Sequence, residues 1–530
     1  MILHGGQIIG GTSSAEGDRT FVGINPATAQ ATTPPVHEAT PAEIGRALGL
    51  ADAAFDQYRR LDADRIAAFL EAAAQAWLDL GDRLLNQAHA ETALPLARLT
   101  GERARMVNQA RLFADLVREG SWRDARIDRA DPGRQPLPKP DVRRLLEPIG
   151  PAVVFGASNF PLAISVGGSD TIAALAVGCP VVAKAHPAHP GTCELIGTAI
   201  ATAAEATGVP AGVFSMLHGA THETGLALVR HPVTRVVSFT GSLAGGRALF
   251  DAAVARPDPI PVYAEMGSTN PVFVLPGAMA ERGEQIAKDY VQSVTLGTGQ
   301  FCTNPGLLLA VDGAATRAFL DAVGEHGRRV PPAAMLHRGI SGSFAAGLGR
   351  LRATPGVRLV AESALAPDSG KSEGQCAIFV TNVDTLDAVT SLWDEVFGPV
   401  SLVVTCARLS DFERVARGMR GHLTASIHAT PEDMSACGGL VTVLERKVGR
   451  IVFNGFPTGI EVCAAMHHGG PYPATTDVHF TSIGSASIDR YVRPVCYQNF
   501  PQQALPVELR DRNQRRIWRL VDGRPTKDDC

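Results

Sequence analysis

Apolar residues recur at helical spacing along much of the first 120 residues, between faces rich in arginine and aspartate. This periodicity predicts three core-facing helices, over residues 47–55, 66–80 and 103–116. We expect a helix to begin at Thr40, because Thr can cap a helix, Pro41 tolerates the first turn and Glu43 can reach back to the cap. The stretch 131–140 carries four prolines, which predicts an extended excursion at a structural seam.

Beyond residue 150 the pattern changes to short apolar runs that alternate with alanine-rich segments of helical period. The runs expected as strands are residues 152–155, 180–183, 236–239, 272–275 and 307–311, and the helical segments are 169–177 and 193–206. Such alternation is typical of parallel βαβ units. The sequence therefore predicts an α/β protein, with a second parallel-sheet domain that begins near Pro271.

Composition excludes several classes of protein. The 530 residues are 45% hydrophobic and 19% charged, which is ordinary for a globular enzyme. The formal charge is only -4, and the arginines between 510 and 519 are interspersed with acids, which favours a solvated terminus over a polyanion site. No uncharged apolar stretch reaches the roughly 18 residues that a membrane span needs. We therefore expect neither nucleic acid nor a membrane as a partner.

The number and spacing of the cysteines indicate the redox environment of the protein. There are nine, an odd number, and they are scattered without a C-x-x-C pair. This pattern opposes a disulfide framework and a zinc ribbon, and it fits a reducing environment. Because the first residues also lack a basic segment followed by a long apolar run, we expect a cytoplasmic location.

Three residues stand where covalent chemistry is plausible. Cys302 lies in a glycine-bearing loop just before a strand, where a thiol can become a nucleophile, although most lone cysteines are buried hydrophobes. Glu265 is surrounded by apolar and small residues, which predicts a raised pKa and a role as general base; backbone N–H groups could equally satisfy it. Asn159 follows a strand and could donate to an oxyanion, but turn formation explains it as well.

A glycine turn after a strand offers a phosphate site. The turn runs through Phe239, Thr240, Gly241 and Ser242 to Gly246. Its backbone N–H groups and the following helix could approach a phosphate. The turn lacks the G-x-G-x-x-G fingerprint, so a purely structural turn is an open alternative.

Lys184 ends an apolar run, so it should stand at the carboxyl end of a strand, where open α/β sheets bind ligands. A surface lysine fits that position equally well. The neighbouring His186 and His189 have no third histidine or cysteine pair near them, and we therefore expect no metal.

Taken together, six segments resemble the motifs of the aldehyde dehydrogenase superfamily in order and spacing. They are residues 155–161, Lys184, residues 239–242, 265–268, 299–302 and 395–399. Four more look like the branch of 2-oxoglutarate semialdehyde (2,5-dioxovalerate) dehydrogenases, namely residues 186–192, 453–459, 468–476 and 493–498. Long-chain aldehyde dehydrogenases share part of that branch pattern. Ser268 departs from the family's frequent Glu-Leu-Gly-Gly but is still small.

The resemblance implies two Rossmann-like parallel-sheet domains and a small β oligomerisation element. The cofactor-binding domain would span residues 1–262, with 125–148 contributing to the oligomerisation hairpin. The catalytic domain would span 263–480, and residues 481–530 would form the oligomerisation strand and the C-terminal tail. A homodimer or homotetramer is then expected.

The resemblance also implies the reaction, which is NAD(P)-dependent oxidation of an aldehyde to a carboxylic acid. Cys302 would form a thiohemiacetal and then a thioester, Asn159 would hold the oxyanion, and Glu265 would activate water. The residues expected to bind the cofactor are Lys184, Phe239, Thr240, Gly241, Ser242, Gly246, Glu395 and Phe397. Because no acid follows Lys184 until Glu194, NADP is favoured over NAD.

Several alternatives stay open. The chain could be a long-chain or other semialdehyde dehydrogenase, a thiol hydrolase that uses Cys302 with a histidine, or a non-catalytic binding protein on the same fold. The distal end of the substrate is not specified by any motif. Candidates to line it are Phe160, Phe301, Phe456 and an arginine such as Arg103 or Arg111, although packing explains each of them equally.

Overall fold

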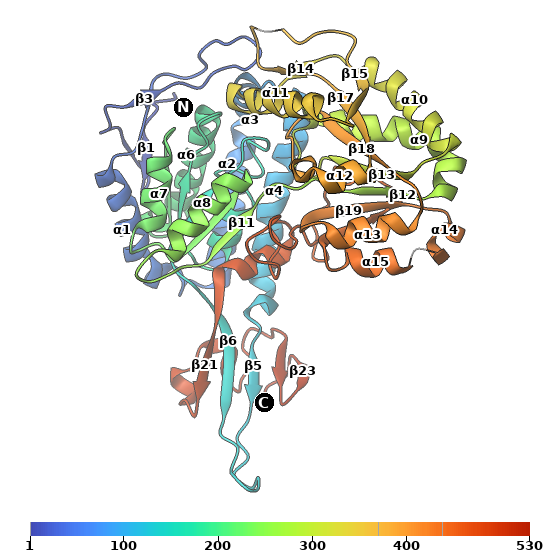
Figure 1. Ribbon diagram of the computed structural model, residues 1–530. Coiled ribbons are helices and arrows are strands. Elements are labelled where there is room, and N and C mark those ends of the chain that lie inside the picture. The colour runs from blue at the N-terminus through green and yellow to red at the C-terminus, as the bar shows by residue number, and fades with distance from the viewer. Residues whose placement is uncertain (1, 369, 437) are drawn as a thin grey trace.

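The computed structural model describes residues 2–368, 370–436 and 438–530. Two lobes lie side by side, and a narrow sheet protrudes beneath them (Figure 1). The first lobe is built on a seven-stranded sheet in the order β11-β10-β7-β8-β9-β1-β2. Its strands are β1 (Gln7–Ile9), β2 (Thr12–Ser14), β7 (Ala152–Phe155), β8 (Val181–Lys184), β9 (Phe214–Leu217), β10 (Val236–Thr240) and β11 (Val262–Glu265). Five strands are parallel, and β1 and β2 extend the sheet antiparallel.

Helices cover both faces of this sheet. One face packs on α1 (Pro41–Tyr58), α7 (His222–Arg230) and α8 (Leu243–Val254). The other packs on α2 (Ala63–Asp79), α3 (Gly81–Thr92), α4 (Leu96–Glu119), α5 (Ser169–Ala176) and α6 (Pro190–Thr207). Val153 and Val154 of β7 enter the two cores in turn, because successive strand residues point to opposite faces.

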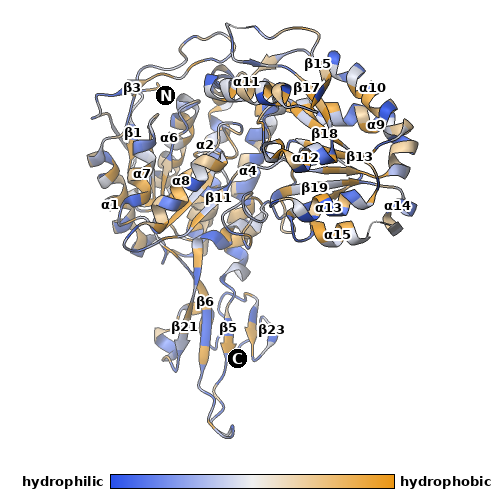
Figure 2. Ribbon diagram, viewed as in Figure 1, coloured by the Kyte–Doolittle hydropathy of each residue, from blue (hydrophilic) through white to orange (hydrophobic). Residues whose placement is uncertain are grey.

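The second lobe repeats this layering. Its sheet runs β15-β17-β18-β13-β12-β19-β20, parallel except for β15. The strands are β12 (Val272–Val274), β13 (Leu307–Val311), β15 (Arg358–Glu362), β17 (Ala377–Asn382), β18 (Val400–Cys406), β19 (His422–His428) and β20 (Val448–Phe453). One face packs on α9 (Pro276–Thr295) and α10 (Ala314–Arg328), the other on α11 (Arg338–Ala353), α12 (Val383–Ala388), α13 (Ser410–Gly418) and α15 (Gly438–Leu444). Figure 2 shows hydrophobic residues concentrated on these buried strands.

The protruding sheet has the order β21-β6-β5-β22-β23. Its strands are β5 (Arg126–Asp128), β6 (Val142–Pro148), β21 (Val492–Gln498), β22 (Arg519–Val521) and β23 (Arg524–Thr526). The predicted proline-rich excursion connects β5 to β6 at the far end of this sheet (Figure 1). The chain begins this sheet after α4, before the parallel strands of both lobes, and returns after those strands to complete it.

Most of the predicted elements are confirmed. The cap at Thr40 is a full capping box, since the Thr40 hydroxyl accepts from the Glu43 N–H at 3.1 Å and the Glu43 carboxylate accepts from the Thr40 N–H at 2.8 Å. The prediction that the C-terminal arginines are solvated is wrong for Arg519. Its side chain is buried and donates to the carbonyls of Arg510, Asp511 and Asp528. Within the described residues, no helix is long and apolar enough to cross a membrane.

Candidate active site

The carboxyl edge of the first sheet gathers the predicted site residues. Strand register places Phe155 beside Lys184, and Thr240 beside Glu265, at the ends of β7, β8, β10 and β11. Because parallel strands end at the same edge, residues that are far apart in the chain, such as Phe155 and Phe239, become neighbours there. This is where open α/β sheets bind ligands.

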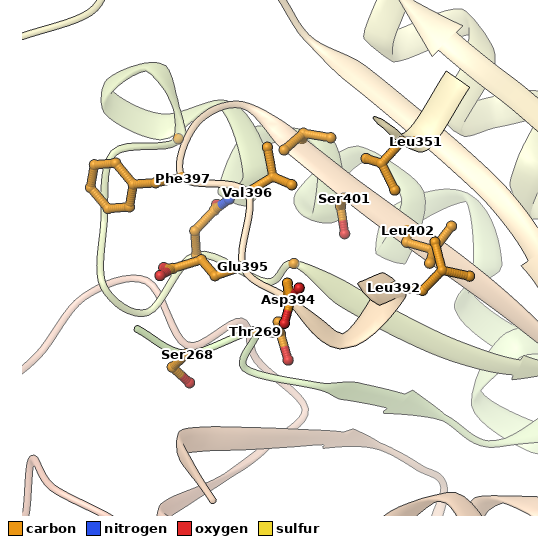
Figure 3. Close-up of a pocket in the computed structure, with 14 residues that line it drawn as sticks. Ser268, Thr269, Leu351, Leu392, Asp394, Glu395, Val396, Phe397, Ser401 and Leu402 are labelled. Carbon is orange, nitrogen blue, oxygen red and sulfur yellow. The ribbon is translucent and has the colours of Figure 1, made fainter. Parts of the chain in front are cut away.

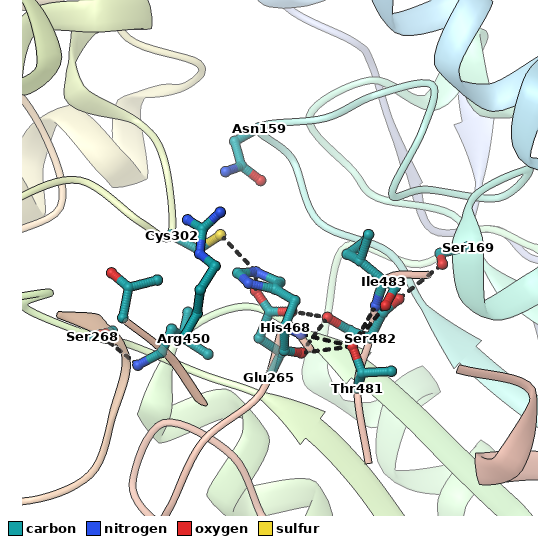
Figure 4. A network of polar contacts seen from close by, with 12 residues as sticks. Asn159, Ser169, Glu265, Ser268, Cys302, Arg450, His468, Thr481, Ser482 and Ile483 are labelled. Carbon is teal, nitrogen blue, oxygen red and sulfur yellow. Dashed lines mark hydrogen bonds and ion pairs between the residues drawn. The ribbon is translucent and has the colours of Figure 1, made fainter. Parts of the chain in front are cut away.

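Glu265, His468 and Cys302 form a compact polar cluster (Figure 4). The Nε2 atom of His468 lies 3.0 Å from Oε1 of Glu265 and 3.4 Å from Sγ of Cys302. The hydroxyl of Ser482 donates to the other carboxylate oxygen of Glu265. Ligand-type atoms of the three residues lie within 4.8 Å of one another, a spacing that a metal ion could also use. The direct His468 contacts make a proton-transfer chain the simpler assignment.

Hydrogen bonds of the main chain hold the segment that carries His468 against the end of β11. Met266 N–H donates to the carbonyl of Ala474 at 2.8 Å. The His468 N–H donates to the Thr481 hydroxyl at 2.7 Å, and the Ser482 N–H donates to the His468 carbonyl at 2.9 Å. The imidazole is therefore held by its own backbone rather than by Glu265 alone.

The charge of Glu265 is stabilised by its neighbours. Burial by itself would raise the pKa of Glu265, but His468 and the hydrogen bonds from His468, Ser482 and Cys302 outweigh it and lower the pKa to about 2. The predicted raised pKa is therefore wrong in this arrangement. Burial and the Glu265 carboxylate raise the pKa of the Cys302 thiol well above its usual value.

The loop that carries Cys302 is pinned on both sides. The buried Asn270 amide donates to the carbonyls of Cys302 and Asn304 at 2.9 and 2.8 Å. Gly299 has a φ of +64°, and a Cβ there would lie 2.2 Å from the backbone of Gly398. Only glycine allows this contact, which joins the Cys302 loop to the loop that carries Glu395.

Asn159 lies beside the same loop. Its buried side-chain amide donates to the carbonyl of Gln300 at 3.0 Å, two residues before Cys302. An amide has two N–H bonds, so one stays available for an oxyanion that forms near the sulfur. The structure thus brings together the three residues that the sequence predicted as catalytic.

The turn after β10 carries the predicted phosphate residues, Phe239, Thr240, Gly241, Ser242 and Gly246, to the start of α8. The exposed Ser242 caps α8, because its hydroxyl accepts from the Gly245 N–H at 3.2 Å. A Cβ on Gly241 would lie 2.6 Å from the Phe239 ring. The close turn leaves the N-terminus of the helix open to an anion.

Glu395 and Phe397 project to the same side of their loop (Figure 3). The cavity behind this loop is lined by Leu351, Leu392 and Leu402 and does not include Cys302 or Glu265. A Cβ on Gly267 would lie 2.4 Å from the Glu395 carboxylate, which therefore sits directly against the strand end that carries Glu265. Burial raises the pKa of Glu395 to about 8 and lowers that of Lys184 to about 8. Because burial disfavours the charged form of both groups, each is stabilised by a hydrogen-bond partner.

The distal candidates separate into two groups. Phe160 and Phe301 meet edge to face with ring centroids 5.5 Å apart, next to Asn159 and Cys302 in the chain. Phe456 packs instead against His428 and Tyr290 of the second lobe, with centroids 4.7 and 5.9 Å away.

The arginines that the sequence suggested lie elsewhere. Arg103 donates to the carbonyl of Gly81 at 2.9 Å, and Arg111 is exposed. Arg105 and Arg450 interact electrostatically with Cys302, and Arg98 packs over the Phe160 and Phe301 rings; no motif marked these three arginines.

The sequence did not lead to a prediction of His468 or Ser482 as site residues, and the reasons differ. His468 begins a segment, 468–476, that carried the branch resemblance, so a signal existed but assigned no role. Ser482 had no signal, because its contact with Glu265 joins residues 217 positions apart.

Comparison with known proteins shows the family of this chain. Residues 12–342 match the aldehyde dehydrogenase family. Alpha-ketoglutaric semialdehyde dehydrogenase 2 of Azospirillum brasilense is 48% identical over 525 residues, which cover 99% of this chain and 100% of that protein. Alpha-ketoglutaric semialdehyde dehydrogenase of Acinetobacter baylyi is 44% identical, with 98% of each chain covered.

Solved structures show the same fold. A 3,6-anhydro-L-galactose dehydrogenase in complex with NAP superposes with a TM-score of 0.79 at 22% identity, over 93% of this chain and 99% of that one. A 1-pyrroline-5-carboxylate dehydrogenase from Thermus with bound NAD gives 0.77 at 21% identity, over 94% and 93%. The chain belongs to the aldehyde dehydrogenase family. Its activity is NAD(P)-dependent oxidation of an aldehyde.

Proposed function

We propose that this chain oxidises 2-oxoglutarate semialdehyde to 2-oxoglutarate, with NADP as the preferred hydride acceptor and NAD as the alternative. The two full-length relatives are named for this aldehyde, under its synonym alpha-ketoglutaric semialdehyde. The observation that carries the chemical part of the proposal is the contact of His468 with both Cys302 and Glu265. This contact provides a nucleophile, a proton acceptor and a base in one place.

The first step is attack of the Cys302 sulfur on the aldehyde carbon. The Nε2–H of His468 donates to Glu265, and the Cys302 thiol also donates to this carboxylate, which accepts the thiol proton. The same Nε2–H lies 3.4 Å from the sulfur and stabilises the thiolate that forms. Sulfur bonds to carbon, and the carbonyl π electrons move to oxygen. The Asn159 amide and the Cys302 backbone N–H hold that oxyanion.

NADP, when bound, supplies the acceptor for the hydride that leaves the thiohemiacetal carbon and converts it to a thioester. We propose that Lys184 and Glu395 hold ribose hydroxyls and that Ser242 and the start of α8 hold the pyrophosphate, with Phe397 beside them. The fit rests on the open N-terminus of α8 and on the Glu395 carboxylate that lies against Gly267. In these roles the protein binds and orients the cofactor.

The last step is hydrolysis of the thioester. Glu265 accepts a proton from water as the water oxygen attacks the carbonyl carbon, and the carbon–sulfur bond breaks. The departing sulfur recovers a proton from Glu265, and the acid is released. A carboxylate with a pKa of about 2 is fully ionised at neutral pH, so Glu265 loses the thiol proton to solvent before it accepts the proton of the attacking water.

The preference for NADP rests on the residues beyond Lys184. An acid that bonds the 2′-hydroxyl of NAD would repel a 2′-phosphate. The following residues are His186, Pro187 and His189, and Glu194 is buried in α6, where it accepts from the N–H groups of His4 and Gly5. That acid is therefore committed elsewhere.

We propose the same domain limits that the family implies, with a cofactor domain to 262, a catalytic domain to 480 and an oligomerisation element that includes 125–148 and 481–530. The protruding sheet supports an assembly of two or four copies, because it extends away from the lobes and its edge strand β21 has a neighbour on one side only. We also propose a cytoplasmic location. The eight cysteines within the described residues are free thiols; Cys437 lies outside them.

Steady-state oxidation by the purified enzyme tests the substrate. The absorbance of reduced nicotinamide is followed with 2-oxoglutarate semialdehyde, succinic semialdehyde and a long-chain aldehyde, each with NADP or NAD. We expect the highest kcat/KM with 2-oxoglutarate semialdehyde and NADP. A preference for the long-chain aldehyde would assign the enzyme to the neighbouring branch and overturn the proposed substrate.

A further inference from the structure

Two guanidinium groups on one face of α4 lie beside the catalytic cluster with unused hydrogen-bond donors. Arg98 and Arg105 are seven residues apart, which is two turns of helix. Among the described residues, Nη1 of Arg98 and both Nε and Nη2 of Arg105 are buried without a hydrogen-bond partner. A buried donor without an acceptor is costly, so such atoms point to a ligand that the protein itself does not supply.

The aromatic rings next to the reacting residues hold both guanidinium groups. The Arg98 guanidinium carbon lies 5.1 Å from the centroid of Phe160 and 4.9 Å from that of Phe301. The Arg105 guanidinium carbon lies 5.5 Å from the Phe160 centroid. Phe160 follows Asn159 and Phe301 precedes Cys302 in the chain, so both guanidinium groups pack on residues that adjoin the oxyanion donor or the nucleophile.

Protein carboxylates leave these donors free. Glu102, on the same helix, uses one oxygen to accept from the N–H groups of Leu162 and Ala163 at 2.8 and 3.0 Å. It acts on Arg98 and Arg105 through space only. Burial lowers the pKa of both arginines, which records the cost of holding two cations away from water.

Arg450 differs from this pair. Its guanidinium donates to the carbonyls of Gly459 and Pro457 at 3.0 and 2.6 Å, so it fastens main chain near Cys302. Arg98 makes one such contact, to the Asn159 carbonyl at 2.7 Å, and Arg105 has two buried donors unused. Arg105 is therefore the cation with the most binding capacity left, and it is electrostatically coupled to Cys302 and Glu265.

We infer that Arg105, assisted by Arg98, is the subsite that binds the carboxylate at the far end of the substrate and thereby selects acid-tailed aldehydes. A guanidinium binds a carboxylate through two parallel N–H bonds, which fixes orientation as well as position. The adjacent Phe160 and Phe301 rings would contact the methylene chain between carboxylate and aldehyde. This inference rests on the proposed function and adds the residues that make it specific.

Substrate pairs test the subsite. Arg105→Met is compared with Arg111→Met, which removes an exposed arginine from the same helix. The substrates are 2-oxoglutarate semialdehyde and pentanal, which has the same number of carbons but lacks the carboxylate and the 2-oxo group. Because a hydrogen bond to a charged group contributes about 1.5–3 kcal/mol, Arg105→Met should lower kcat/KM for the acid by about 10- to 100-fold, mainly through KM. Oxidation of pentanal should stay within about threefold, which also shows that the variant folds.

Two further readouts separate this inference from the proposed function. Arg105→Lys keeps the positive charge but loses the planar guanidinium with its two parallel N–H donors. Its kcat/KM for the acid should therefore fall between those of wild type and Arg105→Met. The affinity of the free enzyme for 2-oxoglutarate, measured by calorimetry, should fall in the same order, from wild type through Arg105→Lys to Arg105→Met. If the wild type prefers the acid and Arg105→Met keeps that preference, the subsite is wrong. If the wild type itself does not prefer the acid over pentanal, the proposed substrate fails whatever Arg105 does.

Discussion

At the scale of single residues, Glu265 and Cys302 control each other's ionisation. The carboxylate is held ionised by His468 and Ser482, and its charge keeps the nearby thiol protonated. The reactive thiolate of the free enzyme is therefore scarce at neutral pH and increases as pH rises. Removal of the negative charge of Glu265 should therefore increase the fraction of Cys302 thiolate at neutral pH.

We predict that Glu265→Gln lowers the pKa of Cys302 and speeds its alkylation by iodoacetamide at neutral pH by about tenfold. The rate is measured on the Cys302 peptide by mass spectrometry across a pH series. The exposed Cys496 in the same samples is the internal control and should react equally in both proteins. Slower alkylation of Cys302 in the variant at every pH would contradict the electrostatic coupling.

The sequence could predict which residues meet but not how they titrate. Cys302, Glu265 and Asn159 each follow or precede a recognisable strand, which made their placement predictable. The pKa of Glu265 depends on His468, 203 residues later, and on Ser482. No local pattern encodes such a distant contact. Arg98 and Arg105 were not predicted for the same reason, since in the sequence they are ordinary helix arginines.

At the scale of elements, α3 anchors the helix that follows Lys184. The buried Glu91 carboxylate accepts from the N–H groups of Gly191 and Thr192 at 2.8 Å each and from the Thr192 hydroxyl at 2.7 Å. These donors belong to the first turn of α6, where the helix has unpaired N–H groups and a favourable dipole for an anion.

We predict that Glu91→Ala lowers the free energy of unfolding by about 2 kcal/mol, because it leaves buried N–H groups without an acceptor. Urea unfolding monitored by tryptophan fluorescence measures this, since Trp77 lies in the same core. Glu205→Ala, at an exposed position near the other end of α6, should change it by less than about 0.5 kcal/mol. Equal effects of the two variants would show that Glu91 does not anchor α6.

Elements with strong periodicity were predictable, and the helix α1 and strands β7 and β13 match closely. Helix α3 was not predicted, although it is 12 residues long, because its buried face includes the polar Glu91 and Thr92. A buried acid that caps another helix disrupts the apolar pattern on which such predictions depend.

At the scale of the whole molecule, β20 is an edge strand with exposed apolar side chains. Phe453 and Ile451 are 55% and 36% exposed, and β20 has a partner on one side only, β19. Unpaired edges with apolar residues favour pairing with another chain. The protruding sheet, whose edge strand β21 is also unpaired on one side, is a suitable partner from a second copy.

We predict that Phe453→Asp shifts the protein from a multiple of 55.8 kDa to a single chain of that mass, because a charge on an edge opposes pairing. Sedimentation equilibrium measures the mass. Leu365→Asp, which places the same charge at a 64% exposed leucine in a loop, should leave the mass unchanged. An unaltered mass in Phe453→Asp would exclude β20 from the assembly interface.

The mechanism depends on a covalent acyl-enzyme on Cys302, which water hydrolyses with Glu265 as the base. Glu265→Gln, mixed with 2-oxoglutarate semialdehyde and NADP and quenched in acid, should retain the acyl group as a thioester. Intact-mass and peptide mass spectrometry should find this adduct on the peptide that contains Cys302, with one equivalent of reduced cofactor and little turnover. Absence of the adduct despite reduced cofactor, or an adduct on another residue, would contradict the account.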